Sequence, residues 1–310
     1  MVITVTLNPA IDKTVKLSNF KIGALNRIKE VRKDAGGKGI NVSKVVAELQ
    51  GQTKALGFLA GSSGQFIADS LEMIGVKHNF TWLAGETRTN LKMIDLATDD
   101  ETEINEPGPQ VSAEDLAKLT DDLLNTVKTG DFVILTGSLP QGTPEDIYAD
   151  LITKVKQKGG KVVLDTYGQS FLEGVKAKPS LVKPNIHELE KIVARPLEST
   201  SKVIEAAKEI HQSGVEIVVV SLGGEGSIVV SQNGVLKVNA PKVEVESTVG
   251  AGDTLVGALS LKLNQGVDLK EAIHFATAAS ANSVTKAGTQ LCKQDEIDQL
   301  LDQITIEILE

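Results

Sequence analysis

FVILTGSLPQGTPEDIYADLITKVKQKGGKVVLD, residues 132–165, is the stretch of this chain that decides its fold. It begins and ends with short apolar runs rich in Val, Ile and Leu, which are typical of buried strands. Between them, Thr143 and Pro144 with the acidic residues that follow predict the start of a helix, and Gly159 and Gly160 predict its end. A strand, a helix and a second strand in this order indicate a parallel β-α-β unit.

The same alternation continues on both sides of this unit. Further apolar runs predict strands at residues 2–7, 56–59, 181–182 and 217–220. Helices are indicated after Ser112, and from Ser199 or Thr200 to about Gly214. Aromatic residues make up only 3% of the chain, so aliphatic side chains must fill the core, as is usual for parallel strands covered by helices. We therefore expect an α/β fold with a doubly wound, mostly parallel sheet flanked by helices.

Two segments break this rhythm, residues 12–33 and 87–105, in which polar and apolar residues alternate without a helical period. We interpret both as parts of a small β-sheet lid. No proline-rich linker, low-complexity tract or repeat separates the chain into parts. The prediction is one domain over residues 1–310, with the lid formed by approximately these two segments.

Composition excludes several classes of protein. The 310 residues carry a formal net charge of −9, which disfavours partners such as nucleic acid and anionic membrane surfaces. Cys292 is the only cysteine, so an internal disulfide and a thiolate metal site are excluded. The first residues are typical of a strand rather than a signal peptide, and no apolar run reaches membrane-spanning length. We expect a cytoplasmic protein.

The sharpest chemical signal is STVGAGDTLVG at residues 247–257. Gly250 and Gly252 allow a tight turn before a helix, so the amides of Ala251, Gly252 and Asp253 can face one anion. A transferring phosphoryl group would be that anion, and the carboxylate of Asp253 would accept the proton of the attacking hydroxyl. The alternative is that Asp253 is only the N-cap of this helix.

A second glycine-rich segment, VSLGGEG, covers residues 220–226. Its glycines would let the backbone approach a nucleotide closely, and Ser221 could add a hydroxyl donor. Residues 227–231 read as another strand, so a simple hairpin is the alternative.

KPNIHE at residues 183–188 places Asn185 and Glu188 on one face at a helix start. An amide oxygen and a carboxylate are hard ligands, suited to hold Mg²⁺ mostly through water beside the phosphates of ATP. A capping box made by the same two residues is the alternative.

AGGKGIN at residues 35–41 precedes a helix expected at 42–50, and Lys38 within it could bind a substrate phosphate. The segment is no Walker A loop, because Gly39 stands where Ser or Thr is required. The Rossmann fingerprint also fails, because Val42 stands where its third glycine is expected.

Basic residues in or beside the two irregular segments suggest a phosphate site. A folded lid could gather Arg27, Lys38, Arg88 and Lys92 around a sugar phosphate and exclude water from the transfer. Solvated surface charges are the alternative for each. Asp12 could hold sugar hydroxyls, or it could be an exposed turn carboxylate.

Five motifs follow one another along the chain: AGGKGIN, TGSLP, KPN, SLGGEG and TVGAGDTLVG. With them the chain resembles the ribokinase-like, or PfkB-type, carbohydrate kinases over nearly its whole length. The resemblance implies a ribokinase-like fold, the cofactors ATP and Mg²⁺, and a β-lid that is often used for homodimer contacts.

The resemblance also implies roles for individual residues. Asp253 is implied as the catalytic base, preceded by Gly250, with Ala251 and Gly252 in the anion hole. Asn185 and Glu188 are implied near Mg²⁺. The residues implied around ATP are Lys183, Asn185, Ser221, Gly223, Gly224, Gly226 and Thr248.

Within the family, TLNPAIDKTV, TRTNLK and NEPGP at residues 6–15, 87–92 and 105–109 are similar to the phosphofructokinase and tagatose-6-phosphate kinase branch. TRTNLK is most similar to that of 1-phosphofructokinases, which implies conversion of fructose 1-phosphate and ATP to fructose 1,6-bisphosphate and ADP. The residues implied at the sugar-phosphate site are Asp12, Gly37, Lys38, Asn41, Arg88, Asn90, Ser138 and Asp253.

Tyr167, in LDTYG, departs from the family's pattern, in which a small hydroxyl residue or Asp is usual before this glycine. Two further functions stay open. The chain could phosphorylate tagatose 6-phosphate or fructose 6-phosphate, because lid geometry sets the position of the existing phosphate. It could also be a noncatalytic sugar-phosphate sensor on the same fold.

Overall fold

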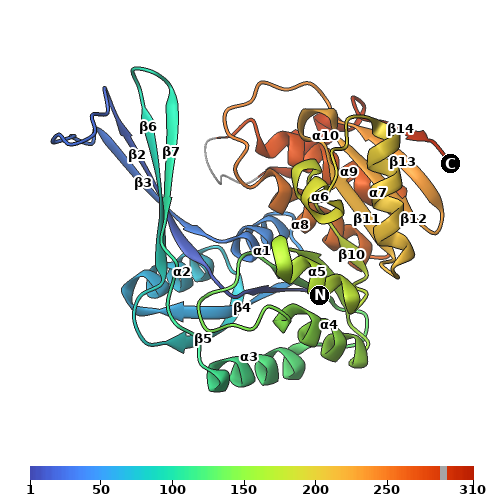
Figure 1. Cartoon of the computed structure of the whole chain (residues 1–310), viewed down its shortest axis with the longest axis horizontal. Coiled ribbons are helices and arrows are strands. Elements are labelled where there is room, and N and C mark those ends of the chain that lie inside the picture. The colour runs from blue at the N-terminus through green and yellow to red at the C-terminus, as the bar shows by residue number, and fades with distance from the viewer. Residues whose placement is uncertain (287–291) are drawn as a thin grey trace.

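The computed structural model describes residues 1–286 and 292–310. These residues form one ten-stranded sheet, one separate four-stranded sheet, and helices on both faces of the larger sheet (Figure 1). Seven neighbouring strands of the large sheet run parallel, and three antiparallel strands follow at one edge. In spatial order they are β14 (Thr305–Ile308), β13 (Gly234–Asn239), β12 (Ser227–Ser231), β11 (Ile217–Ser221), β10 (Leu181–Val182), β9 (Lys161–Asp165), β8 (Phe132–Thr136), β1 (Val2–Thr6), β4 (Thr53–Ala60) and β5 (Lys77–Leu83).

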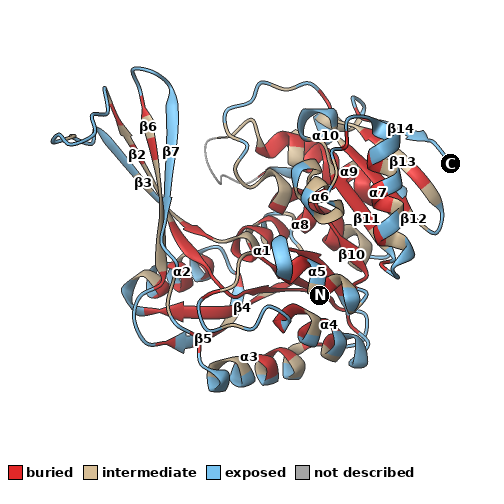
Figure 2. Cartoon of the chain, viewed as in Figure 1, coloured by how far each residue is buried: buried red, intermediate tan, exposed pale blue. Residues whose placement is uncertain are grey.

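Helices cover the sheet because its central strands are apolar on both faces. β1 and β8 are buried at every position, and Figure 2 shows the sheet in red beneath helices that are pale blue on their outer sides. The helices of one face are α1 (Lys38–Glu48), α2 (Gly61–Met73), α8 (Ala251–Asn264), α9 (Leu269–Ser283) and α10 (Gln294–Leu301). Those of the other face are α3 (Ala113–Thr126), α4 (Ile147–Gln157), α5 (Gly168–Lys176), α6 (Ile186–Val193) and α7 (Thr200–Gln212). The predicted doubly wound α/β fold is confirmed.

Two helix starts differ from those expected. α4 begins at Ile147 and not directly after an N-cap at Thr143, because the amide of Ile147 bonds to Pro144 O at 3.2 Å and closes a turn before the helix. α1 begins at Lys38 and not at residue 42, since Asn41 N already bonds to Gly37 O at 3.0 Å. Residues 38–41 of AGGKGIN therefore form the first turn of α1, and residues 35 and 36 end the preceding strand. The N-cap of α1, Gly37, has a φ of 111°, which a residue with a side chain rarely adopts.

The small sheet consists of β3 (Glu30–Gly36), β2 (Ala10–Leu17), β6 (Arg88–Asp95) and β7 (Asp100–Asn105), in that order. It confirms the separate small sheet expected from the irregular segments, although β3 continues to residue 36. β2 and β6 pair in parallel, and both outer pairs are antiparallel. In Figure 1 this sheet rises from the main body beside the start of α1.

The carboxyl ends of β1, β8 and β9 meet the start of α1, and Asn41 of α1 bonds to Asp253 near the start of α8. This edge of a parallel sheet is where ligands usually bind. Within the described ranges, no helix has the length and apolarity needed to cross a membrane.

Candidate active site

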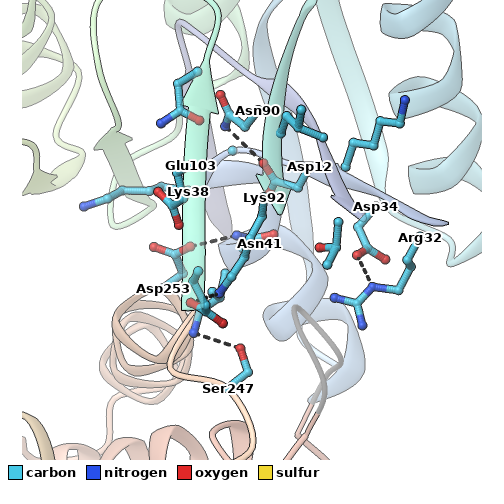
Figure 3. A pocket seen from close by; sticks show the side chains of 18 of the residues that line it. Asp12, Arg32, Asp34, Lys38, Asn41, Asn90, Lys92, Glu103, Ser247 and Asp253 are labelled. Atoms are coloured by element: carbon cyan, nitrogen blue, oxygen red, sulfur yellow. Dashed lines mark hydrogen bonds and ion pairs between the residues drawn. The ribbon is translucent and has the colours of Figure 1, made fainter. Parts of the chain in front are cut away.

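A cavity of about 810 Å³ lies between the small sheet and the carboxyl ends of β1 and β8 (Figure 3). Side chains of β2, β3, β6 and β7 line one side, and the first turns of α1 and α8 line the other. The structure brings together in this lining every residue that the resemblance implied for the sugar phosphate: Asp12, Gly37, Lys38, Asn41, Arg88, Asn90, Ser138 and Asp253. Their individual roles stay predictions.

Asp253 is the third residue of α8 and is only 7% exposed. Its Oδ2 accepts a hydrogen bond of 2.8 Å from Asn41 Nδ2. Burial raises the pKa of Asp253 to about 6; nearby Lys38 opposes this shift, and Asp165 adds to it. The N-cap alternative is wrong, because the cap residue is Gly250 and no side chain caps the helix. The carboxylate is therefore directed into the site with a pKa suited to a general base.

The turn before Asp253 has the predicted glycine geometry. Gly250 adopts the left-handed conformation with a φ of 81°. The next amides lie in the first turn of α8, where the helix itself supplies no acceptor. Ala251 N reaches Thr248 O at 3.4 Å, which leaves Gly252 and Asp253 as the better anion donors. A Cβ on Gly252 would stand 3.2 Å from Lys183 Nζ, so this glycine lets the lysine lie against the turn.

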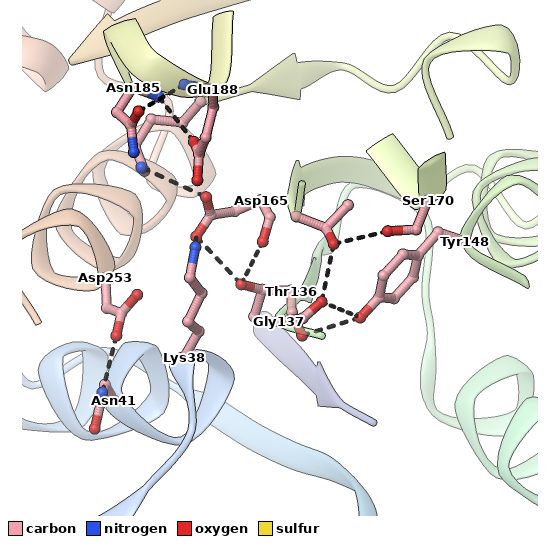
Figure 4. Close-up of polar contacts among 12 residues, drawn as sticks. Lys38, Asn41, Thr136, Gly137, Tyr148, Asp165, Ser170, Asn185, Glu188 and Asp253 are labelled. Atoms are coloured by element: carbon pink, nitrogen blue, oxygen red, sulfur yellow. Dashed lines mark hydrogen bonds and ion pairs between the residues drawn. The ribbon is translucent and has the colours of Figure 1, made fainter. Parts of the chain in front are cut away.

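Asp165, which lies outside the five motifs, connects these parts (Figure 4). It is the last residue of β9 and is 1% exposed. Its carboxylate lies 3.2 Å from Lys38 Nζ and 3.4 Å from Lys183 Nζ. Burial alone would raise the pKa of Asp165, but the two lysines outweigh it, so the pKa is lowered. Asp165 in turn raises the pKa of Lys38 against the effect of burial. An acidic residue at the carboxyl end of a buried strand was the signal that could have found it.

Asn185 and Glu188 form the capping box that was the alternative to metal binding. Asn185 Oδ1 accepts from Glu188 N at 2.8 Å, and Glu188 Oε2 accepts from Asn185 N at 2.9 Å. Glu188 Oε1 takes no part in this box. The described part of the chain has no group of three or more His, Cys, Asp or Glu side chains that could hold a metal unaided. This donor set fits an ion that keeps most of its water, as Mg²⁺ does beside phosphates.

The second glycine-rich segment lies beside the first residues of α6. Asn185 and Ser221 form a parallel bridge, and Ser221 N donates to Pro184 O at 3.1 Å. β11 and β12 form the hairpin that was the alternative reading. A Cβ on Gly223 would meet nothing within 4 Å, and the same holds for Gly224, so both leave open space. Gly226 is required by packing, since a Cβ there would lie 1.9 Å from Val238 O.

The cavity also carries polar groups of the small sheet. Asn90 Nδ2 donates to Asp12 Oδ1 at 3.1 Å, and Asp12 lies within β2, so the exposed-turn alternative is wrong. Ser138 Oγ accepts from Asn8 Nδ2 at 3.3 Å. Among the described residues, the buried amide oxygens of Asn8, Asn41 and Asn90 have no hydrogen-bond partner. Such acceptors match the hydroxyl donors of a sugar.

The predicted gathering of basic side chains is correct only in part. Lys38, Arg88 and Lys92 line the cavity, whereas Arg27 is exposed in the connection between β2 and β3 and does not line it. Lys92 Nζ lies 2.6 Å from Glu101. Arg88 donates to the backbone carbonyls of Asn8 and Glu106 at 3.1–3.3 Å. The guanidinium of Arg88 therefore lines the cavity, and its hydrogen bonds go to neutral carbonyl oxygens rather than to carboxylates.

Tyr167, the departure from the family's pattern, is half-exposed and lines the same cavity. It is the residue before α5, and its backbone carbonyl accepts from Ser170 Oγ at 3.0 Å. Its ring therefore stands at the wall of the cavity.

Comparisons with known proteins agree with this geometry. The chain is 35% identical to the 1-phosphofructokinase of Bacillus subtilis (strain 168), over 99% of both chains. It is 34% identical to the tagatose-6-phosphate kinase of Staphylococcus epidermidis, also over 99% of both. The crystal structure of phosphofructokinase-2 from Escherichia coli in complex with potassium matches with a TM-score of 0.92 and 30% identity, covering 97% of this chain and 98% of that one.

The family model described as pfkB family carbohydrate kinase matches residues 2–296. The ribokinase-like fold, the glycine turn and the buried Asp253 all agree with that match. This chain therefore belongs to the pfkB family of carbohydrate kinases, enzymes that transfer a phosphoryl group to a hydroxyl group.

Proposed function

We propose that this kinase transfers the terminal phosphoryl group of ATP to the C6 hydroxyl of fructose 1-phosphate, giving fructose 1,6-bisphosphate and ADP. The observation that carries the proposal is Asp253, a buried carboxylate with a pKa of about 6 in the lining of a cavity large enough to hold a sugar phosphate. The relatives named 1-phosphofructokinase support the choice of substrate.

In the proposed reaction, Asp253 accepts the proton of the C6 hydroxyl while the hydroxyl oxygen forms its bond to the terminal phosphorus. The bond from that phosphorus to the bridging oxygen of ATP breaks, and ADP leaves. The amides of Gly252 and Asp253 would donate to the transferring group, and the positive end of α8 would stabilise its charge. Lys38 and Lys183, both beside Asp165, would add positive charge near the same group.

The nucleotide would lie beside the open glycines Gly223 and Gly224, with Ser221 and Thr248 near it. Mg²⁺, when bound, neutralises charge on the phosphates. Asn185 and Glu188 would hold it, mostly through water, since the capping box leaves Glu188 Oε1 available.

The sugar phosphate would bind against the small sheet. Arg88 is the preferred partner of its phosphate, because the hydrogen bonds of this guanidinium go to backbone carbonyls rather than to carboxylates. Asp12 and Asn90 would contact the sugar hydroxyls.

We further propose that the small sheet acts as a lid on a single domain of residues 1–310 and that it carries a homodimer contact. Its inner face is polar and lines the cavity. Its outer face presents Val31 and Ile104, which are 54% and 56% exposed. An exposed apolar face on a thin sheet favours contact with a second copy. The chain's homologues in sugar metabolism favour a cytoplasmic location.

A substrate panel tests the assignment. Coupled ADP release is measured under saturating ATP and Mg²⁺ with fructose 1-phosphate, fructose 6-phosphate and tagatose 6-phosphate. We expect the highest kcat/KM with fructose 1-phosphate, by about tenfold or more, because a misplaced phosphate leaves charged groups unpaired. A higher value with either 6-phosphate would replace the assigned substrate. Sugar-phosphate binding without ADP formation would instead support the sensor alternative.

A further inference from the structure

Asp165 joins two lysines that are far apart in the sequence. Oδ2 contacts Lys38 at the first turn of α1, and Oδ1 contacts Lys183 just before α6. Thr136 Oγ1, at the end of β8, donates to Oδ2 at 3.2 Å. The side chain of Asp165 is 1% exposed and that of Lys183 is 6% exposed, so this contact is largely out of water.

The two lysines lie on different sides of the site. Lys38 lines the sugar cavity and is 33% exposed. Lys183 lies against the glycine turn, where a Cβ on Gly252 would be 3.2 Å from its Nζ. Both are close enough to Asp253 to lower its pKa. A lysine side chain has four rotatable bonds and a strongly hydrated head, so each ammonium needs a fixed partner to stay in one place.

We propose that Asp165 is a positioning residue that holds the ammonium groups of Lys38 and Lys183 on the two sides of the transferring phosphoryl group. The inference goes beyond the residues of the proposed reaction, although the path of the phosphoryl group rests on that proposal. Because both lysines contact the same carboxylate, Asp165 links the sugar side of the site to the nucleotide side. Loss of this carboxylate would displace both lysines.

The same geometry predicts a change in pH dependence. Lys38 and Lys183 lower the pKa of Asp253, Asp165 raises it, and Asn41 lowers it by a hydrogen bond; the charge of Lys44 also interacts with Asp253. Loss of the Asp165 carboxylate removes its raising effect, but displacement of the two lysines removes two lowering effects, and that of Lys38 alone exceeds that of Asp165, so the pKa of Asp253 should rise. If both lysines instead stayed in place, only the charge of Asp165 would be lost, and the acid limb of the rate profile would move to lower pH.

The test compares Asp165→Asn with Asp131→Asn. Asp131 is also a buried carboxylate, and it pairs with the amino terminus at 2.8 Å near the opposite end of β8. Turnover is measured from pH 5 to pH 9 with whichever acceptor of the substrate panel the wild-type enzyme uses best. An inactive wild type with fructose 1-phosphate would thus contradict the substrate assignment while leaving this test intact.

For Asp165→Asn we expect kcat to fall about 100-fold, as for other small misplacements of catalytic groups, and the acid limb to move to higher pH. Asp131→Asn should keep the wild-type kcat and the wild-type acid limb. In a protein that already carries Lys38→Met, Asp165→Asn should reduce kcat by a smaller factor than in the wild type, because the two substitutions remove one shared interaction. Normal kcat in Asp165→Asn, an acid limb that stays in place or moves to lower pH, or full additivity with Lys38→Met would overturn the proposal.

Asp165→Glu keeps the charge and serves if the asparagine variant does not fold. Its kcat should fall and its acid limb should move to higher pH, because the longer side chain keeps the negative charge but displaces both lysines. A Glu variant with wild-type kcat would refute the positioning role.

Discussion

The acid limb of the rate profile reports directly on Asp253. A carboxyl with a pKa of about 6 is about 90% ionised at pH 7 and about 9% ionised at pH 5. A carboxyl with the ordinary pKa of 3.8 would still be about 94% ionised at pH 5. Because the base must be ionised to accept a proton, we expect lowering the pH from 7 to 5 to reduce its contribution about tenfold.

Asp253→Asn provides the control, since the sugar phosphate itself titrates near pH 6. The variant keeps the titration of the substrate and loses that of the carboxyl. We expect turnover to fall by about 10²–10⁴-fold at pH 8, and the ratio of wild-type to variant kcat/KM to fall about tenfold from pH 7 to pH 5. Coupled ADP release at constant ionic strength measures both. A ratio that stays constant over this range would refute Asp253 as the titrating base.

Two further predictions concern stability and metal dependence. The pKa of Asp253 is raised from 3.8 to about 6, so its ionised form costs about 3 kcal/mol of folding free energy above pH 6, and this cost disappears as the pH falls below 4. Asp253→Asn should therefore increase the free energy of unfolding in urea by about 1–3 kcal/mol at pH 8 and much less at pH 4; a loss of stability at pH 8 would contradict the burial argument. EDTA should abolish turnover, and Glu188→Gln should raise the Mg²⁺ concentration for half-maximal rate about tenfold or more, because it removes the charge while an amide oxygen can still accept from Asn185 N. Glu114→Gln, in the first turn of α3, is the matched control for a lost helix-start carboxylate, and an unchanged Mg²⁺ requirement in Glu188→Gln would exclude the metal role.

Local sequence patterns predicted most helix and strand positions because they depend on near neighbours. The Ser112 cap of α3 is one example, since its partner Asp115 is only three residues away. The start of α1 was placed four residues late, and that of α4 three residues early. At α1 the first turn contains glycines and a cavity-facing lysine, so the apolar period begins only later. At α4 the turn closed by Pro144 replaced the expected threonine cap.

The residues of the candidate site also form two groups: those that local sequence indicates, and those that only the fold brings together. The sequence indicated Gly250, Gly252 and Asp253, because a glycine turn and a helix start depend only on adjacent residues. Asp165 was missed because its partners, Lys38 and Lys183, are distant in the sequence and meet it only after the strands pair. Arg27 was placed wrongly for a related reason, since proximity to the lid segment does not determine which face or end of the sheet a side chain occupies.

By itself, the sequence determined the class of fold, the order of strands and helices, and the motifs of a carbohydrate kinase, because hydrophobic period, glycine and capping residues act over a few positions. Only the tertiary structure decided that Asp253 is buried with a raised pKa and that Asp165 bridges two lysines. It also decided which face of the small sheet lines the cavity. These properties depend on burial and on distances between residues far apart in the chain, and both exist only once the sheets and helices have packed.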